Sequence, residues 1–510
     1  MTRDETRAGI LQHPYLLATM GSCALVFLAA FESMAVTTIM PLVSRELNGS
    51  GLYALAFAGP LATGVIGMVV AGNWADRRGP AAPLYASVAL FAAGLLIAGT
   101  AVSMPILVGG RLVQGLGGGA LTVALYVVIA RVYPSRLHAQ VFAAFSAAWV
   151  IPSMIGPFAA GVVAELSSWH WVFLGVVGLV VPALAMILPA IRGMGSGRVS
   201  GSLPVPSPEI GADPEPVATV PWAFGRMGWA ALAALAVLGL NLSGHLPGAG
   251  GAIAVVALFL AVLAVRPLVP RGTLVAQRGL PAVILMRGIA SAAFFGAEVY
   301  VPYLLTDRYS FLPAFAGLAL TGSALSWAGA SAVQGRLGSR LGDALAVRIG
   351  SVSVLGAIAT ALATTVFSWP AGVAIVGWLF AGAGMGLMYP RLSVMTLAMS
   401  GPEDQGFNSS AMSISDSLGG ALSLATTGLV FVALTTTADA PFAGVFALTA
   451  GIAVVGLVIA PRVAGRPTLS KRGRVVSSRP SGKRSGVESP GGAKEPDDAD
   501  EADDADDVRA

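Results

Sequence analysis

Five charged residues lie inside long apolar stretches of this sequence, where an ion is costly to place. They are Glu32, Arg111, Arg287, Glu298 and Asp416. A charge at the middle of a lipid bilayer costs about 2.5–3.5 kcal/mol on insertion scales. A carboxyl group in such surroundings can exchange a proton, bind an organic cation or pair with an arginine. These residues are therefore the first candidates for a functional site.

Glu32 and Arg111 are expected to lie at a similar depth. Glu32 stands nine residues before Pro41, about 13 Å along a helix, and Arg111 lies about 9 Å into the stretch that begins at residue 105. Burial favours the neutral carboxylic acid, whereas a neighbouring arginine favours the carboxylate. Moving the arginine, or displacing it with a cationic substrate, would switch the carboxyl group between these states. A static ion pair that locks two helices together is the alternative.

Glu298 is followed closely by Tyr300 and Tyr303. Aromatic ring faces attract organic cations by about 0.5–2 kcal/mol. We therefore consider Glu298 and the two tyrosines as substrate-binding residues. Alternatively, the tyrosines belong to the aromatic belt at the outer membrane surface.

Asp416 is flanked by Ser413, Ser415 and Ser417, whose hydroxyl groups can solvate its carboxylate. The alternative is a polar cluster that packs two helices together. Arg287 stands only one or two turns into its apolar stretch, so that its side chain can reach the headgroups instead of a site.

The composition requires a membrane protein around these residues. Hydrophobic residues make up 55% of the 510 residues and charged residues 11%, less than half the usual share of a soluble protein. The apolar runs are about 20 residues long, the length that spans a bilayer as a helix. We predict an all-α, polytopic protein with fourteen transmembrane helices, at residues 16–41, 51–73, 82–102, 105–130, 138–164, 169–190, 223–242, 247–266, 279–305, 312–335, 346–368, 370–390, 405–434 and 441–461.

The sequence lacks the residues that metal sites, ATP-binding sites and hydrolytic active sites require. Cys23 is the only cysteine and there are four histidines, so that neither a disulfide nor a metal site is expected. No phosphate-binding G-x-x-x-x-G-K-[ST] motif and no Ser/His/Asp set stand out. We expect no enzyme, no cofactor, no metal and no nucleic-acid partner.

The segments between the apolar runs give the domain organisation. We expect a cytoplasmic N-terminus (1–15), a six-helix half (16–190), a flexible cytoplasmic linker (191–222), two extra helices (223–266), a second six-helix half (279–462) and a disordered charged tail (463–510). A tail whose basic residues touch anionic lipid is an alternative for the last segment. Arginines gather on one side of the predicted helices, which places both termini in the cytoplasm.

The two halves resemble each other. GNWADRRG at 72–79 matches GRLGSRLG at 335–342, and GLGGG at 115–119 matches GAGMG at 382–386. These pairs and the pair Glu32 and Glu298 are separated by 263, 267 and 266 residues. Transporters are often built from two such repeats with the site at their interface. The sequence therefore favours a 6+2+6 arrangement of helices.

These motifs resemble those of the major facilitator superfamily and its fourteen-span drug:proton antiporter branch. RLVQGLG at 111–117, Gly156-Pro157 with Gly161, ESMAVTTIMP at 32–41 and WHWVF at 169–173 are similar to signatures of that branch. The resemblance covers residues 14–462 without the linker. The sequence departs from the signatures at Glu32, Trp74, Pro80, Ala81, Pro152, Ala160 and Ser339.

The resemblance implies roles in conformational change. It implies that Asp76, with Gly72, Arg77 and Gly79, stabilises the outward-facing state by contacts between the halves, and that Gly156 and Pro157 bend a helix that seals the inner side of the path. An arginine-rich cytoplasmic turn and an ordinary membrane kink are the alternatives.

We expect a monomeric transporter of the plasma membrane that exports hydrophobic, cationic small molecules in exchange for protons by alternating access. Export of an endogenous lipid or metabolite, proton-coupled uptake, and a receptor that transports nothing are the competing interpretations.

Overall fold

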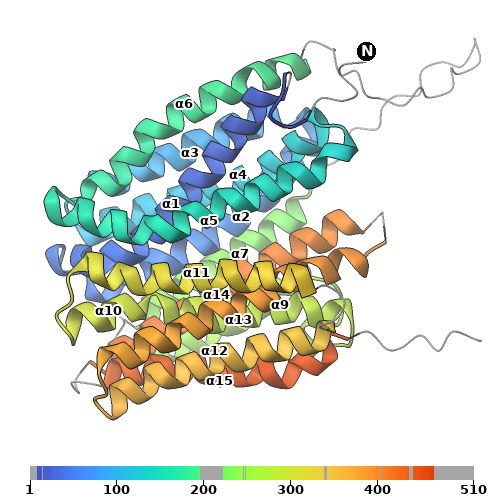
Figure 1. Cartoon of the computed structure of the whole chain (residues 1–510). Helices are drawn as coiled ribbons and strands as arrows, with labels where there is room; N and C mark the ends of the chain where they lie inside the picture. Colours follow the sequence, from blue (N-terminus) through green and yellow to red (C-terminus); the bar gives the residue numbers. More distant parts are fainter. Residues whose placement is uncertain are drawn as a thin grey trace, which may run out of the picture. The chain divides into compact units, whose positions relative to one another are not determined.

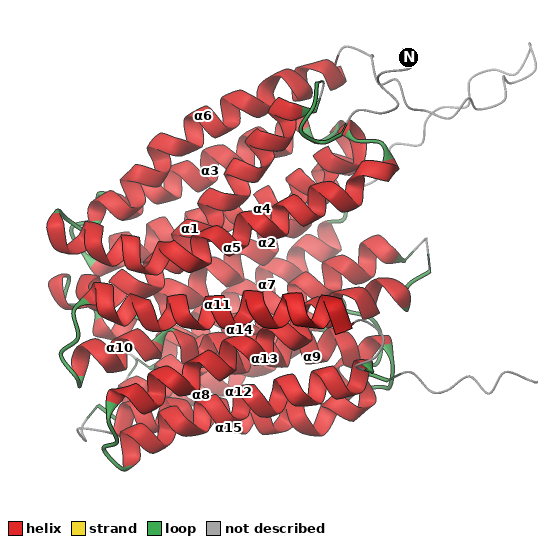
Figure 2. Cartoon of the chain, viewed as in Figure 1, coloured by secondary structure: helices red, strands yellow, loops and turns green. Residues whose placement is uncertain are grey.

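The fold is a bundle of long helices. The computed structural model describes residues 9–13, 15–195, 222–244, 246, 248–337, 342–401, 404–435 and 440–464. Every regular element in these ranges is helical (Figures 1 and 2). The expectations for the first eight residues, for the linker beyond residue 195 and for the tail beyond residue 464 lie outside the described residues.

The first repeat contains six helices and a short 3-10 turn, η1 (Ser50–Leu52). The helices are α1 (Leu16–Glu46), α2 (Leu55–Arg78), α3 (Ala81–Gly99), α4 (Met104–Val132), α5 (Ser135–Leu166) and α6 (His170–Gly195). Two further helices follow, α7 (Phe224–Ser243) and α8 (Gly250–Val265), and then the turn η2 (Thr273–Val275).

The second repeat corresponds to the first helix by helix. It contains α9 (Leu280–Glu298) continued by α10 (Tyr300–Asp307), then α11 (Pro313–Leu337), α12 (Asp343–Val366), α13 (Ala371–Ala398), α14 (Gln405–Ala433) and α15 (Ala440–Ile459), and the turn η4 (Ala460–Arg462). In the first repeat α4 packs on α2 and α3, while α1 packs on α5 and α6. In the second, α13 packs on α11 and α12, while α9 packs on α14 and α15. The same packing pattern in both halves confirms the predicted internal repeat.

Glycines allow the closest of these contacts. A Cβ atom on Gly119 of α4 would lie 2.0 Å from the carbonyl oxygen of Gly64 of α2. A Cβ atom on Gly386 of α13 would lie 2.3 Å from the carbonyl oxygen of Trp327 of α11. Small residues at helix crossings are the usual means of close packing in membranes. The two glycine-rich motifs therefore serve the same purpose in the two halves.

Twelve helices in the described ranges are long and apolar enough to cross a membrane. α8 is shorter, with sixteen residues, and α11, which carries several Gly, Ser and Thr residues, is outside that set. With α8 and α11 added to the twelve, and with α9 and α10 forming one span, the described ranges contain the fourteen helices that the sequence predicts.

The predicted end of the first span was wrong. We expected the first span to end at Pro41, but α1 continues to Glu46 with Pro41 inside it. Proline removes one backbone hydrogen bond from a helix and bends it locally. The helix nevertheless continues, because the residues on both sides of Pro41 are buried and packed. The span expected at 279–305 is confirmed as one span, Leu280–Asp307, in which only Val299, itself helical in its backbone angles, separates α9 from α10.

The halves contact each other through α5 with α11 and α2 with α14. Near the end where α1 finishes and α10 finishes, Arg45 pairs with Asp307 at 3.1 Å, and the Ala314 N–H donates to Glu165 Oε1 at 2.8 Å. Toward the opposite end, α5 and α11 diverge (Figure 1). The halves are therefore joined most closely at one end of the bundle.

Candidate functional site

Glu32 lies in a buried three-residue network between α1 and α4. Arg111 donates from one guanidinium nitrogen to Glu32 Oε1 and Gln114 Oε1, and Gln114 Nε2 donates to Glu32 Oε2. Arg111 Nε also donates to the carbonyl oxygen of Ala56 of α2, at 3.1 Å. Glu32, Arg111 and Gln114 are only 3%, 5% and 4% exposed. Both carboxylate oxygens therefore have donors, and the charge of Glu32 has a partner.

The depth argument placed Glu32 and Arg111 within reach, and the structure brings them into contact. Gln114 was missed as a site residue, although it stands in the quoted helix motif. The spacing could have identified Gln114, because residues three apart on a helix lie on one face. Gln114 is therefore on the same face of α4 as Arg111.

Glu298 has a different environment. It ends α9, is 8% exposed, and has no hydrogen bond or ion pair with any residue that the structure describes. Phe294, one turn earlier on the same face, stacks on Trp378 and meets Trp327 edge-on, with ring centroids 5.4 and 5.5 Å apart. A buried carboxyl group without a partner is unusual, because its charged form loses the hydration that water provides.

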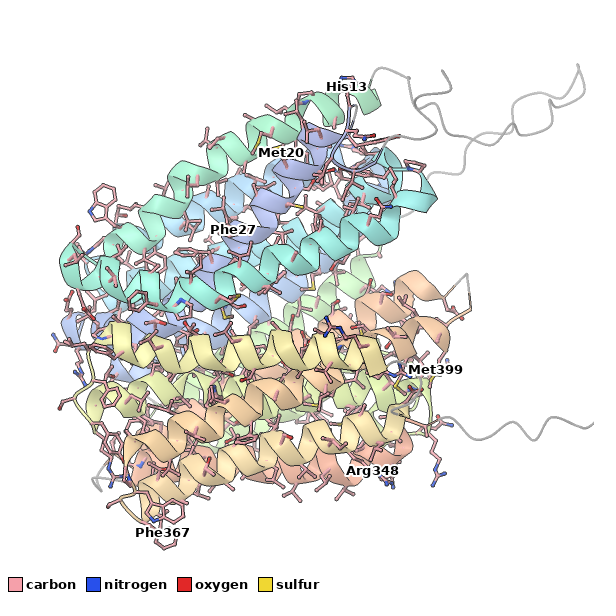
Figure 3. The ribbon with its side chains drawn as sticks, in the orientation of Figure 1. His13, Met20, Phe27, Arg348, Phe367 and Met399 are labelled. Atoms are coloured by element: carbon pink, nitrogen blue, oxygen red, sulfur yellow. The ribbon has the colours of Figure 1, made fainter. Side chains whose placement is uncertain are left out.

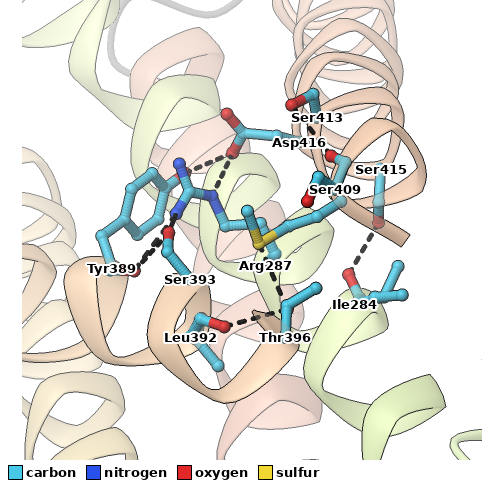
Figure 4. Close-up of polar contacts among 11 residues, drawn as sticks. Ile284, Arg287, Tyr389, Leu392, Ser393, Thr396, Ser409, Ser413, Ser415 and Asp416 are labelled. Carbon is cyan, nitrogen blue, oxygen red and sulfur yellow. Dashed lines mark hydrogen bonds and ion pairs between the residues drawn. The ribbon is translucent and has the colours of Figure 1, made fainter. Parts of the chain in front are cut away.

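Asp416 belongs to a polar cluster with Arg287, Tyr389 and Ser393 (Figure 4). Arg287 Nε donates to Asp416 Oδ1 at 3.1 Å, and the Tyr389 hydroxyl donates to the same oxygen at 2.7 Å. The Arg287 guanidinium lies 3.5 Å from the centre of the Tyr389 ring and donates to Ser393 Oγ at 3.3 Å. Arg287 therefore does not reach out to the headgroups but forms part of this cluster.

The three serines beside Asp416 do not solvate it as expected. The Ser415 hydroxyl donates to the Ile284 carbonyl at 2.8 Å, and the Ser413 hydroxyl donates to the Ser409 carbonyl at 3.2 Å (Figure 4). Neighbours in sequence point in different directions around a helix, and the residues that solvate Asp416 come from α9 and α13 instead.

Tyr300 and Tyr303 lie in an aromatic cluster between the two halves. Tyr53, between η1 and α2, lies 5.7 Å from Tyr300 and 4.7 Å from Tyr303 between ring centroids, and its hydroxyl donates to the Val299 carbonyl at 2.7 Å. Phe431 and Phe442 complete the cluster. Because Tyr300 is 1% exposed and Tyr303 8% exposed, neither side chain stands in a lipid-facing belt.

Asp76 is exposed in the last turn of α2, and its carboxylate has no partner among the described residues. The Arg77 guanidinium lies 4.7 Å from the centre of the Trp222 ring, just before α7. Gly79 has a φ of 82°, a value that glycine adopts without strain, while Gly72 is near Val123, 3.5 Å from the position of an added Cβ atom. Among the described residues, no hydrogen bond or ion pair joins Asp76 to the second half.

Gly156 and Pro157 lie where α5 meets α1 and α11. A Cβ atom on Gly156 would contact Phe31 and Met34 of α1 at 3.5 and 3.7 Å. The Pro157 carbonyl oxygen would lie 2.7 Å from a Cβ atom on Gly317 of α11. This pair therefore belongs to the contact between the halves.

The structure does not bring all predicted site residues together. No hydrogen bond or ion pair among the described residues joins Glu32 to Glu298 or to Asp416. Glu32 belongs to the first half, whereas Glu298 and Asp416 belong to the second. The same part of the chain holds no group of three or more His, Cys, Asp or Glu residues able to bind a metal ion.

Long apolar helices in two repeated halves, with acids buried inside, define a polytopic membrane protein of the two-repeat transporter type. The model of the Major Facilitator Superfamily matches residues 22–297, more than half of the chain. The chain belongs to this superfamily and is a transporter, not an enzyme.

Two of the proteins that this chain is similar to are named for multidrug efflux. A probable multidrug-efflux transporter of Mycobacterium tuberculosis is 27% identical over 416 residues, covering 79% of this chain and 85% of the relative. A multidrug efflux pump of Staphylococcus aureus is 24% identical over 173 residues, covering 34% and 39%. A crystal structure of a POT family transporter in complex with 5-aminolevulinic acid has a TM-score of 0.65 at 14% identity, covering 89% of this chain and 98% of that one. This last likeness concerns the fold alone.

Proposed function

We propose that this protein exports hydrophobic, cationic small molecules across the plasma membrane in exchange for protons, by alternating access. The observation that carries the proposal is Glu298, a buried carboxyl group without a hydrogen-bond or ionic partner in the described part of the chain. Without a cation nearby, such a group is most stable as the neutral acid. A cationic substrate that approaches it favours the carboxylate, so that substrate and proton compete for one site.

Glu32 supports the proposal in a complementary way. Its carboxylate is held by Arg111 and Gln114, and it needs no proton while these partners stay in place. Removing one member of a buried pair leaves an uncompensated charge that costs about 3–5 kcal/mol. Any rearrangement that separates α1 from α4 at this depth therefore favours protonation of Glu32, which links its proton to the position of the helices.

One helical turn before Glu298, Phe294 begins a group of aromatic side chains that favours a hydrophobic, cationic substrate. Phe294 contacts both Trp327 and Trp378, and the Trp378 indole N–H is buried without a hydrogen-bond partner. Tryptophan faces provide the strongest cation–π attraction of the aromatic side chains. The multidrug-efflux names of the relatives favour export of drugs over uptake.

The contacts between the halves are consistent with alternating access. Arg45 with Asp307 and Tyr53 with Val299 join the halves at the end of the bundle that we assign to the outside. Asp76 at the other end makes no such contact with a residue that the structure describes. We assign this arrangement to an inward-facing monomer with both termini in the cytoplasm.

Transport into everted vesicles or proteoliposomes tests the proposal. The panel contains lipophilic organic cations and neutral analogues of the same size, with and without an imposed pH gradient. We expect Glu298→Gln to fold normally and to lose gradient-driven transport of the cations, because a neutral amide cannot exchange a proton. Glu298→Asp, which keeps the carboxyl group, serves as the matched control. Cation transport that survives collapse of the pH gradient, or wild-type rates in Glu298→Gln, would contradict the proposal.

A further inference from the structure

The connection between α8 and α9 carries exposed arginines on a tightly folded backbone. Arg271 and Arg278 flank the turn η2. The Gln277 N–H donates to the Gly272 carbonyl at 3.1 Å, which closes the loop between the two arginines. The Gly279 N–H donates to the Arg462 carbonyl at 3.0 Å, which attaches the loop to the last described turn of the chain.

These two backbone hydrogen bonds bring three arginines together. Arg271 precedes Gly272, Arg278 lies between Gln277 and Gly279, and Arg462 accepts the bond from Gly279. Gly272 and Gly279 have φ values of 86° and 91°, which only glycine adopts without strain. We refer to Arg271, Arg278 and Arg462 as the arginine cluster.

The arginine cluster has no anionic partner in the described part of the chain. All three residues are exposed, and no side-chain hydrogen bond, ion pair or ring contact involves them there. Other arginines of the protein do have carboxylate partners: Arg391 pairs with Asp343, and Arg287 pairs with Asp416. Three exposed arginines on backbone segments joined by hydrogen bonds, with no anionic partner among the described residues, can together bind an anion.

The turn between the arginines presents apolar side chains outward. Leu274 is 42% exposed and Val275 is 75% exposed. η4, which contains Arg462, packs on α12. Figure 3 shows the end of the bundle at which α12 begins, marked by Arg348 and Met399, and Phe367 marks the opposite end. η4 directly follows α15 and also contacts α9. Exposed apolar side chains next to basic residues are typical of a segment that contacts the membrane interface.

We propose that the arginine cluster binds the phosphate of an anionic phospholipid, with Leu274 and Val275 inserted beside its acyl chains. Guanidinium groups bind phosphate oxygens by paired hydrogen bonds, which favours arginine at such sites. A free phosphate ion needs the arginines but not the two apolar residues. Arg278 precedes α9 and Glu298 ends it, so that the two sites lie at opposite ends of this helix, and the lipid site does not depend on the proposed transport function.

A second anion is available within the chain itself. The run from Glu495 to Asp507 is acidic and follows Arg462 in the sequence. That run contains few apolar residues, so it does not account for the exposure of Leu274 and Val275. The membrane lipid is therefore the occupant that the surface favours, and the acidic run is an outcome for the experiment to test.

The experiment titrates the purified full-length protein in neutral detergent with a fluorescent phosphatidylglycerol and follows its anisotropy. Parallel titrations use the matching phosphatidylcholine, and inorganic phosphate is added as a competitor. The variants are Arg271→Gln, Arg278→Gln and Arg462→Gln singly, and Leu274→Ser with Val275→Ser. Arg336→Gln is the matched control, because Arg336 is also exposed at a helix end and has no partner in the described residues.

We expect each arginine variant to bind phosphatidylglycerol about fivefold more weakly, as about 1 kcal/mol per basic residue predicts. The double serine variant should weaken binding of both lipids, and Arg336→Gln should bind as the wild type does. Equal binding of the two lipids by the wild type, or equal effects of Arg336→Gln and the cluster variants, would overturn the proposal. Complete displacement of the lipid by millimolar phosphate would also overturn the proposal, because it would identify a free phosphate ion as the ligand. Tighter lipid binding after the acidic run is neutralised to Asn and Gln would overturn it as well, because it would identify that run as the occupant of the site. Thermal unfolding of each variant verifies that it is folded.

Discussion

Glu32 depends on two different donors, and only one of them was expected. Arg111 supplies the charge, while Gln114 donates to the second carboxylate oxygen and accepts a hydrogen bond from Arg111. An unsatisfied buried polar group costs about 1–3 kcal/mol. The amide is therefore as important for the geometry of this site as the charge is for its electrostatics.

We expect Gln114→Leu to lower the free energy of unfolding by about 1–3 kcal/mol, because one carboxylate oxygen and one guanidinium N–H lose their partners. Thermal unfolding of the detergent-solubilised protein measures this loss. Gln334→Leu is the control, since Gln334 is similarly buried, 8% exposed, and has no hydrogen bond with a described residue. A loss that is no larger than in Gln334→Leu would mean that the amide does not hold Glu32.

Tyr389 stabilises the Arg287–Asp416 pair in two ways that two substitutions separate. Tyr389→Phe removes the hydroxyl bond to Asp416 but keeps the ring below Arg287, while Tyr389→Leu removes both. We expect the first to cost about 1.5–3 kcal/mol and the second about 0.5–2 kcal/mol more. Chemical unfolding in detergent measures both, with Tyr85→Phe as a control for loss of a hydroxyl group without a described partner. Equal losses for Phe and Leu would show that the ring adds nothing.

The sequence allowed some of these residue contacts to be predicted and concealed others. Glu32 and Arg111 could be matched because depth along a helix follows from residue counting. The partners of Asp416 could not, because Arg287 and Tyr389 come from helices whose rotation is set by tertiary packing. The nearby serines were the obvious candidates in sequence, yet they bond to backbone carbonyls.

At the scale of elements, the glycine motifs in α4 and α13 determine how closely helices approach. Gly119→Leu places side-chain atoms where the Gly64 carbonyl now lies, 2.0 Å from the new Cβ atom, and Gly386→Leu does the same at Trp327. We expect both variants to fail to accumulate as folded protein. Fluorescence-detected size exclusion measures this outcome. Gly109→Leu in the same helix α4 is the control, because no atom lies within 4 Å of its added Cβ atom. Normal yields of Gly119→Leu would contradict close packing of α2 on α4.

Helix number and order were predictable from apolar length, whereas helix ends were less so. Proline at position 41 suggested an end for α1, but tertiary contacts carry the helix one turn further. The contact of the Val299 carbonyl with the Tyr53 hydroxyl had no signal in the apolar pattern, because the two residues are 246 positions apart in the chain.

For the whole molecule, the inserted helices are more than a connection between the halves. α7 packs on α2 of the first half and on α14 of the second. At its start the Ala223 N–H donates to Asn73 Oδ1 at 3.3 Å, and the Arg226 guanidinium lies 4.8 Å from the centre of the Phe407 ring. The sequence predicted a hairpin without a counterpart in the repeat. It gave no indication that one helix of this hairpin contacts both halves, because that depends on how the halves are arranged.

Movement of the halves against each other is tested where α2 and α14 meet. A Cβ atom on Gly428 of α14 would lie 2.5 Å from the Ala54 Cβ atom at the start of α2. A disulfide needs about 3.8 Å between these atoms, so that a shift of about 1 Å allows Ala54→Cys and Gly428→Cys to be joined. The pair is introduced together with Cys23→Ser, which removes the only native cysteine.

If transport requires these ends to separate in each cycle, oxidation should stop transport of a lipophilic cation and a reducing agent should restore it. Each single cysteine variant controls for oxidation without a cross-link, and a shift in gel mobility after cleavage between the halves measures its extent. Full transport by completely cross-linked protein would show that the α2–α14 contact stays closed throughout the cycle. Alternating access would then require the halves to pivot about this contact while α5 and α11 alone separate.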